Sequence, residues 1–361
     1  MRIPKAIITG GGRATRLRPI TYTINKHLIP LANKPMIVHA IEKVAACGIK
    51  DIAINTNPGD RELAAALGDG SRFGVRLHFF EQEGGPLGLA HVVKVAQSFI
   101  GNDAFLFYLG DNIILGGIEH LVQKFERENL NCLLALARVK DPQRFGVPVF
   151  EGDRLVRVEE KPADPKSPYA VTGIYCYDTH YFELFDTIIP SSRGEYEISD
   201  VHTRYLERGY KVGWEEISGW WKDTGKPDDL LEGNQLLLNE VLKTNGEVLG
   251  TIAPGATLQG KVHIGLGTVV GDRVLIRGPV VIGENCVLNN CYIGPYTSIG
   301  NGVEIYNSEI EHSIIFDKAN IHCETRIVDS IIGAHALVIP SHETLPSGHR
   351  LIVGDNAVVE L

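Results

Sequence analysis

The C-terminal third of the chain repeats an aliphatic residue every five or six positions, a spacing that few folds allow. The aligned positions are Leu258, Ile264, Val270, Ile276, Ile282, Leu288, Ile293, Ile299, Ile305, Ile310, Ile315, Ile321, Ile327 and Ile332. A helix turns about every 3.6 residues and a strand alternates every ~2, so neither keeps one face at this spacing. A coil with one short strand and one corner per repeat does, with the aliphatic side chain inside and Gly or Asn at the corner.

This repeat resembles that of the hexapeptide-repeat proteins, which form a left-handed parallel β-helix. The left hand is implied by the resemblance, because the general rule for parallel crossovers favours the right hand. We expect the β-helix domain to occupy residues 241–361. Its flat sides and the open strand edges at its ends predict a homo-oligomer formed through this domain.

Residues 1–240 alternate between short apolar strands and amphipathic helices. Strands are expected at 5–9, 51–55, 76–80 and 104–109, and helices at 35–47, 88–99, 117–128 and 226–242. Strand–helix alternation predicts an α/β, Rossmann-like domain with helices on both faces of a mostly parallel sheet. A hairpin expected at 147–158 would make that sheet mixed.

Composition excludes several classes of protein. The 35 Lys and Arg residues against 44 Asp and Glu give a net charge of −9, so the chain lacks the basic surplus that binds a nucleic-acid backbone. No apolar run approaches the ~18 residues of a membrane span, and residues 1–12, MRIPKAIITGGG, do not have the apolar core and small-residue cleavage site expected of a signal peptide. The 6 cysteines are scattered, which predicts reduced thiols in a cytoplasmic protein.

The first expected strand runs into a glycine-rich loop, residues 10–19, with the sequence GGGRATRLRP. Glycines such as Gly11 and Gly12 let backbone N–H groups approach an anion closely. A dehydrogenase loop fits poorly, because Thr15 replaces its third glycine and no acidic residue ends a second strand ~20 residues later. From the loop alone, a phosphate site and a structural turn both remain open.

With the following segment, TINKHLIPLANKPM at 23–36, the loop resembles the motif of the sugar nucleotidyltransferases. Further family motifs follow in order: LGDN at 109–112, EKP at 160–162, AVTGIY around Gly173, GEYEISD at 194–200, WWKDTG at 220–225 and the C-terminal residues 354–361. Together with the β-helix, this order is most similar to the long forms of glucose-1-phosphate thymidylyltransferases.

The resemblance implies Mg²⁺-dependent nucleotidyl transfer from a nucleoside triphosphate to a sugar 1-phosphate, giving an NDP-sugar and pyrophosphate. The expected pair is dTTP and glucose 1-phosphate, while UTP or another nucleotide and a different sugar remain open. Positioning and charge neutralisation carry such a reaction, because two polyanions must meet. No histidine is assigned a catalytic role, since the attacking phosphate is already ionised.

The site residues are also implied by the resemblance. The catalytic cations are Arg16, Lys26 and Lys161. The nucleotide would contact Gly11, Gly12, Thr15, Arg16, Gln82, Glu83, Gly88 and Asp111. The sugar phosphate would contact Asn112, Gly146, Glu160, Lys161 and Val171. Asp111 and Asp223 would hold Mg²⁺, which needs few carboxylates. Taken singly, Asp111 could equally cap a turn, and Glu160 with Lys161 could be a surface ion pair.

Three positions depart from the family motif. Ala14 stands where a glycine is usual, and its Cβ should narrow the loop or demand a negative φ. Asn25-Lys26-His27 replaces a proline-flanked lysine, which should loosen the local turn. One extra residue precedes Gly88, so either Gln82 or Glu83 could face the base.

Two other functions remain open. Hexapeptide β-helices often carry acyltransferases with a histidine base, and this region contains His263, His312, His322 and His335. We interpret each histidine as a corner or face residue instead. A non-catalytic, regulatory homologue is the other alternative, although it would not need two carboxylates and two cations in one site.

Overall fold

The structure, a computed structural model, describes residues 2–12, 14–217, 219–242 and 246–340. The contacts divide the chain into two compact units. The first comprises Met1–Arg13 and Ile37–Asp223, and the second comprises Ala14–Met36 and Thr224–Leu361. The boundary expected at 240/241 stays a prediction, as does the C-terminal motif at 354–361, which lies outside the described residues.

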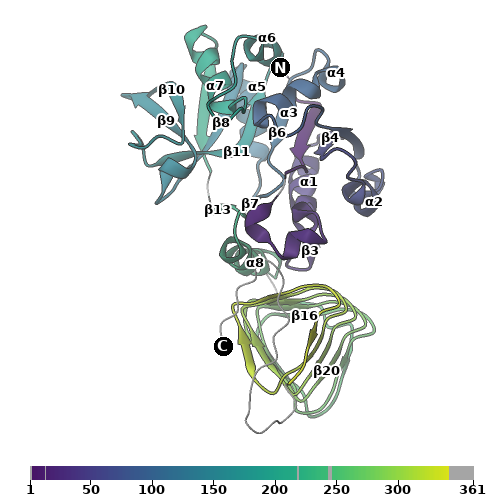
Figure 1. The fold of residues 1–361 in the computed structure, drawn as a ribbon. Coiled ribbons are helices and arrows are strands. Elements are labelled where there is room, and N and C mark those ends of the chain that lie inside the picture. Colours follow the sequence, from purple (N-terminus) through teal and green to yellow (C-terminus); the bar gives the residue numbers. More distant parts are fainter. Residues whose placement is uncertain (1, 13, 218, 243–245, 341–361) are drawn as a thin grey trace. The chain divides into compact units, whose positions relative to one another are not determined.

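A seven-stranded sheet in the order β12-β8-β11-β6-β1-β4-β5 forms the centre of the first unit (Figure 1). Its strands are β1 (Lys5–Thr9), β4 (Asp51–Thr56), β5 (Arg76–Glu81), β6 (Phe105–Tyr108), β8 (Cys132–Arg138), β11 (Tyr169–Tyr177) and β12 (Val212–Glu216). β11 runs antiparallel to β6 and β8, and the other pairs are parallel. The mixed, mostly parallel Rossmann-like sheet is therefore confirmed.

The expected hairpin forms, but it is not what makes the sheet mixed. β9 (Gly146–Glu151) and β10 (Arg154–Glu160) pair antiparallel in a separate two-stranded sheet. The antiparallel strand of the large sheet is β11, whose long apolar run lies between β6 and β8. Two further pairs are β2 (Pro30–Leu31) with β3 (Lys34–Pro35), and β7 (Asn112–Ile114) with β13 (Trp221–Asp223).

Helices of the first unit bury their apolar faces against the sheet. They are α1 (Met36–Ala46), α2 (Glu62–Leu67), α3 (Leu89–Val95), α4 (Gln97–Ile100), α5 (Glu119–Glu128), α6 (His180–Phe185) and α7 (Ile198–Glu207), with short 3-10 turns η4 (Ser71–Phe73) and η5 (Pro142–Arg144). A buried cluster joins α3, α6 and α7 to strand residues such as Phe105, Phe107 and Tyr177. Among the described residues, no helix is both long and apolar enough to cross a bilayer.

Three parallel sheets form the coil of the second unit, consistent with a left-handed β-helix. Their strands are β14 (Thr251–Ile252), β15 (Thr257–Gln259), β16 (Val262–Ile264), β17 (Val269–Val270), β18 (Leu275–Arg277), β19 (Val280–Ile282), β20 (Val287–Asn289), β21 (Tyr292–Ile293), β22 (Thr297–Ile299), β23 (Glu304–Tyr306), β24 (Glu309–Glu311), β25 (Ile314–Ile315), β26 (Asn320–His322), β27 (Arg326–Val328), β28 (Ile331–Ile332) and β29 (Leu337–Val338). Leu258 pairs with Ile276, and Ile276 with Ile293, so three repeats complete one coil.

The corners of the coil correct one expectation. Asn285, Asn290 and Asn307 hold left-handed corners as expected, but so do larger residues. Gly265, Gly283 and Gly300, which follow core isoleucines, serve another purpose, because a Cβ on each would lie 2.7, 2.8 and 2.7 Å from a backbone atom of the next coil. These glycines therefore permit close stacking of coils rather than a positive φ.

One outer face of the coil is covered within the second unit. The outward residues Val281, Ser298 and Ile314, on neighbouring strands, are all buried. Helix α8 (Pro227–Val241) packs on β22 and on β2. The same unit contains the 3-10 turns η1 (Thr15–Leu17), η2 (Ile20–Tyr22) and η3 (Lys26–Leu28).

Candidate functional site

Two aspartates predicted to bind metal lie at one end of a strand pair in the first unit. Asp111 lies between β6 and β7, and Asp223 is the last residue of β13. β13 runs antiparallel to β7, so Asp223 faces Asn112, the residue next to Asp111. Both carboxylates are partly buried. The structure thus brings together two residues that are far apart in sequence.

The side chain of Asn112 supports this pair. Its Nδ2 donates to Asp111 Oδ1 at 3.0 Å, and its Oδ1 accepts from Trp221 Nε1 at 2.6 Å and from the Gly173 amide at 3.2 Å. A Cβ on Gly173 would lie 2.8 Å from that Oδ1, so only glycine fits there. The predicted contact of Asn112 with the sugar phosphate stays a prediction, because its amide is already engaged with protein groups.

The donor set suits Mg²⁺. This ion binds one or two carboxylates and completes its shell with water and phosphate oxygens. Within the described ranges, no cluster of three or more His, Cys, Asp or Glu side chains is arranged to hold a metal ion. Asp111 and Asp223 therefore fit a metal shared with a phosphorylated ligand, rather than a closed structural site.

A second group of predicted residues gathers at the end of the β9–β10 hairpin. Lys161 Nζ lies 3.1 Å from Glu160 Oε1, and Ser199 Oγ donates to Glu160 Oε2 at 2.7 Å. Gly146 lies beside them, since a Cβ there would be 2.9 Å from Ser199 Oγ. Val171, also assigned to the sugar phosphate, is buried in the core of the sheet.

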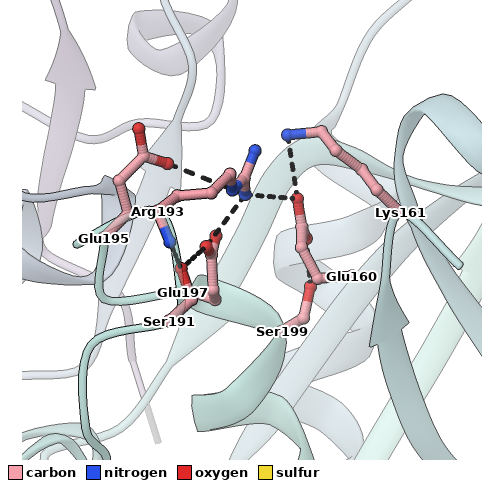
Figure 2. A network of polar contacts seen from close by, with 7 residues as sticks. All are labelled: Glu160, Lys161, Ser191, Arg193, Glu195, Glu197 and Ser199. Carbon is pink, nitrogen blue, oxygen red and sulfur yellow. Dashed lines mark hydrogen bonds and ion pairs between the residues drawn. The ribbon is translucent and has the colours of Figure 1, made fainter.

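Sequence reasoning missed Arg193, which lies in the same group. Figure 2 shows its guanidinium among three carboxylates, and Nη2 lies 2.8 Å from Glu197 Oε1, 3.5 Å from Glu160 and 3.7 Å from Glu195. The hydrogen bond to Glu197 raises the pKa of Arg193. Its position directly before the motif at 194–200 was the available signal.

One ring contact connects these groups, and both act on the same buried tyrosine through their charges. The ring of Phe145, the neighbour of Gly146, meets the Trp221 ring edge to face at 5.1 Å. Burial raises the pKa of Tyr175, and the charges of Glu160 and Asp111 raise it further. The carboxylate pair and the Glu160 group therefore belong to one region of the first unit.

Gln82 and Glu83 differ sharply in their surroundings. Gln82 is buried, and its Nε2 donates to the Gly88 carbonyl at 3.3 Å and lies 3.3 Å from His91 Nδ1. Glu83 is exposed. Gly88 has a φ of 98°, and a Cβ there would lie 2.6 Å from the Tyr196 carbonyl oxygen, which explains the glycine.

The glycine loop is held by two asparagines, Asn55 within β4 and Asn57 directly after it. The Gly10 amide donates to Asn55 Oδ1 at 3.0 Å, and the Gly12 amide donates to Asn57 Oδ1 at 2.8 Å. A Cβ on Gly11 would lie 2.8 Å from Asn55 Nδ2. In this conformation two amides of the loop are hydrogen-bonded to asparagine side chains. Contact of Gly11 and Gly12 with a phosphate stays a prediction.

A model of the nucleotidyl transferase family matches residues 5–240. The chain belongs to this family. A glucose-1-phosphate thymidylyltransferase of Streptomyces griseus is 39% identical over 358 residues, covering 99% of both chains. The low-salt glycan biosynthesis nucleotidyltransferase Agl11 of Haloferax volcanii is 39% identical over 361 residues, covering 99% of this chain and 100% of the relative.

A solved structure from Bacillus anthracis, provisionally assigned as a glucose-1-phosphate thymidylyltransferase and containing sucrose, has a TM-score of 0.61. It is 40% identical and covers 64% of this chain and 94% of that one. The family recognised from the motifs is therefore confirmed. The two full-length relatives also span the β-helix of this nucleotidyl transferase.

Two departures from the family motif are explained by the second unit. Ala14 adopts a φ of 44°, so the expected negative φ is wrong, and the alanine takes the conformation that glycine would. Asn25 Oδ1 accepts from the His27 amide at 2.9 Å, and His27 is buried. The turn at Lys26 is thus capped rather than loosened as expected.

Arg16, the arginine predicted to be catalytic, also lies in the second unit. Thr15 and Arg16 are exposed on η1. A Cβ on Gly225 would lie 3.0 Å from Arg16 Nη2, so the last glycine of the WWKDTG motif leaves room for the guanidinium. The glycine loop and the WWKDTG motif are therefore connected in the fold, because the Arg16 guanidinium of one lies against Gly225 of the other.

The four histidines in the described part of the β-helix lie on the coil itself. His312 and His335 hold left-handed corners. His322 Nε2 lies 2.9 Å from Asn307 Nδ2, and His263 is on β16. These positions agree with the interpretation as corner and face residues, and no observation favours an acyltransferase.

Proposed function

We propose that this nucleotidyl transferase joins a nucleoside triphosphate to a sugar 1-phosphate and releases pyrophosphate, with dTTP and glucose 1-phosphate as substrates. The observation that carries the proposal is the occurrence of two groups in one unit. A carboxylate pair suited to a phosphate-bound cation accompanies a lysine–arginine–glutamate group suited to a phosphorylated sugar. The name of the full-length Streptomyces griseus relative, a glucose-1-phosphate thymidylyltransferase, supports the substrate pair.

Lys161 and Arg193 would bind the phosphate of the sugar. Each now pairs with Glu160, whose second oxygen accepts from Ser199. When Lys161 and Arg193 pair with the phosphate instead, the Glu160 carboxylate becomes available to accept hydrogen bonds from sugar hydroxyls. The amide of Gly146 and the neighbourhood of Asn112 and Val171 would complete this subsite.

The reaction needs no general base. A phosphate oxygen of the sugar attacks the α-phosphorus, the α–β P–O bond breaks, and pyrophosphate leaves with the electron pair. Because the attacking phosphate is ionised near neutral pH, the chain's own groups serve to position and neutralise charge. Arg16 and Lys26 would neutralise the triphosphate.

We infer that Mg²⁺ is the metal held by Asp111 and Asp223. When bound, it would neutralise phosphate charge and polarise the α-phosphoryl group. Asn112 orients the Asp111 carboxylate through Nδ2, and Trp221 and Gly173 in turn fix Asn112.

Gln82 is the better candidate for facing the base. Since its Nε2 is engaged by the Gly88 carbonyl, its Oε1 is the atom left to accept a hydrogen bond. Thymine and uracil offer a matching N–H donor. Gly11, Gly12, Thr15 and the Gly88 turn would surround the rest of the nucleotide, and exposed Glu83 would have no part in base selection.

The catalytic region would be residues 1–240, with a β-helix domain at 241–361 through which a cytoplasmic homo-oligomer forms. Pyrophosphate release with Mg²⁺ tests the proposal, with dTTP, UTP, ATP, GTP and CTP crossed against several sugar 1-phosphates. We expect release that requires both substrates and is fastest with dTTP and glucose 1-phosphate. No pyrophosphate release with any pair of substrates would contradict the proposal and favour a regulatory homologue.

A further inference from the structure

A tight turn in the second unit joins the segment that carries Lys26 to the rest of that unit. The turn connects β2 and β3, and its two central residues, Ala32 and Asn33, have φ values of 48° and 60°. The left-handed region is unfavourable for a residue with a Cβ. Alanine gains no local hydrogen bond there, so contacts from outside the turn must hold it.

Asn234 of α8 supplies such a contact. Its side chain is completely buried, and its Oδ1 accepts from the Ala32 amide at 2.7 Å and from Ser298 Oγ at 2.9 Å. Its Nδ2 donates to the Tyr296 carbonyl at 3.1 Å. One buried amide therefore joins the turn to two residues of a single coil of the β-helix.

The neighbouring turn residue reaches the same coil directly. Asn33 Nδ2 donates to the carbonyl of Ile299 at 2.5 Å. Ser298 and Ile299 belong to β22, whose outer face is buried under α8. The two left-handed residues of the turn are thus both held by hydrogen bonds, Ala32 to Asn234 of α8 and Asn33 to Ile299 of β22.

The turn is connected to Lys26 by short-range bonds. The Met36 amide donates to the Ile29 carbonyl at 3.0 Å, which closes the β2–β3 hairpin at its base. The Ile29 amide donates to the Lys26 carbonyl at 3.1 Å. A displacement of the turn would therefore move the backbone of Lys26.

We propose that Asn234 is a positioning residue for Lys26, through which the β22 coil of the β-helix fixes the cationic segment that binds the triphosphate. The inference rests on the proposed function, because it takes Lys26 as a triphosphate contact. It assigns the β-helix a part in substrate binding, besides any part in assembly. Sugar-phosphate residues of the first unit are outside this set of bonds.

Three full-length variants test the proposal. Asn234→Ala removes the three hydrogen bonds of the Asn234 side chain, and Ser298→Ala removes one of them while leaving Asn234 in place. Asn239→Ala is the matched control, since Asn239 is exposed on the same helix. Three quantities are measured: the Kd for dTTP with Mg²⁺ in the absence of sugar phosphate, the KM for glucose 1-phosphate, and amide hydrogen exchange of residues 26–36.

We expect Asn234→Ala to weaken dTTP binding by about 10- to 100-fold, because displacing a charged contact by ~1 Å has effects of this size. Exchange at 26–36 should accelerate, while the KM for glucose 1-phosphate stays within about threefold. Ser298→Ala should act in the same direction but less, and it serves alone if Asn234→Ala does not fold. Asn239→Ala should match the wild type.

Unchanged dTTP affinity in a folded Asn234→Ala or Ser298→Ala variant would overturn the inference, even with faster exchange at 26–36. That result is expected if the hydrogen bonds of Asn234 stabilise the fold but do not position Lys26. The proposed function is tested separately with the wild-type protein. If that function is wrong, the wild type binds no dTTP and releases no pyrophosphate.

Discussion

Asp223 lies directly opposite Asn112 across the β13–β7 pair, and the Asn112 side chain in turn donates to the Asp111 carboxylate. This relationship brings two separate sequence motifs together in the fold. It also explains the tryptophan before the second aspartate, because the Trp221 indole donates to the Asn112 side chain.

Replacing either aspartate by asparagine should abolish metal-dependent turnover. Asp111→Asn and Asp223→Asn keep side-chain size but remove the charge, and we expect turnover to fall by about 100-fold or more. Asp153→Asn, in the exposed β9–β10 turn, is the control and should keep wild-type rates. Initial rates over a range of Mg²⁺ concentrations check this; a wild-type rate at low Mg²⁺ in either variant would refute the metal assignment.

Base selection should depend on Gln82 and not on Glu83. Gln82→Ala removes a hydrogen-bonded amide, and a bond of this kind contributes about 1–3 kcal/mol, which is roughly 5- to 150-fold in selectivity. The ratio of kcat/KM for dTTP to that for ATP measures the effect. Glu83→Ala is the matched control and should leave the ratio unchanged. The reverse pattern would show that Glu83 faces the base.

Ala14 should tolerate glycine and reject valine. Its φ of 44° is strained for alanine, so Ala14→Gly relieves about 1 kcal/mol, part of which is offset by the greater freedom of an unfolded glycine. Ala14→Val should destabilise the protein, since a β-branched residue fits this region worst. Calorimetric unfolding checks both; a Ala14→Gly variant less stable than Ala14→Val would contradict the assigned conformation.

Stability of the first unit should fall in mild acid because of His202. This ring is fully buried against the Tyr177 hydroxyl, and burial lowers the pKa of His202 to about 3. Below about pH 6.5 the unfolded chain takes up a proton that the folded chain does not, so stability decreases as pH falls. From pH 7 to pH 5 this amounts to about 2 kcal/mol.

Tryptophan fluorescence is a suitable probe for that change, since Trp214, Trp220 and Trp221 all lie in the first unit. Denaturant unfolding is compared between the wild type and His202→Gln at both pH values. Between pH 7 and pH 5, the free energy of unfolding should fall by about 2 kcal/mol less in the variant than in the wild type. Parallel losses in the two proteins would show that His202 is not the source.

Periodic features were predictable from sequence, and long-range ones were not. The repeat of aliphatic residues predicted the β-helix, and the apolar runs predicted β1, β4, β5 and β6 to within one residue at each end. Family motifs named Asp111, Asp223, Glu160 and Lys161, which the structure brings into two neighbouring groups.

Other features depend on contacts that no local pattern contains. The bond between Ala32 and Asn234 spans 202 positions, so nothing near either residue predicts that the segment at 14–36 belongs with the β-helix. Arg193 was missed because its role is visible only once three glutamates surround it. The left-handed φ of Ala14 is set by the loop around it rather than by the preference of alanine.

The fate of the α-phosphorus tests the central claim most directly. The purified protein is incubated with Mg²⁺, glucose 1-phosphate and dTTP labelled with ³²P at either the α or the γ position. The account predicts that α label appears in a sugar nucleotide, while all γ label leaves as pyrophosphate. Label from the γ position on the sugar, or no transfer from dTTP or UTP, would contradict nucleotidyl transfer by this chain.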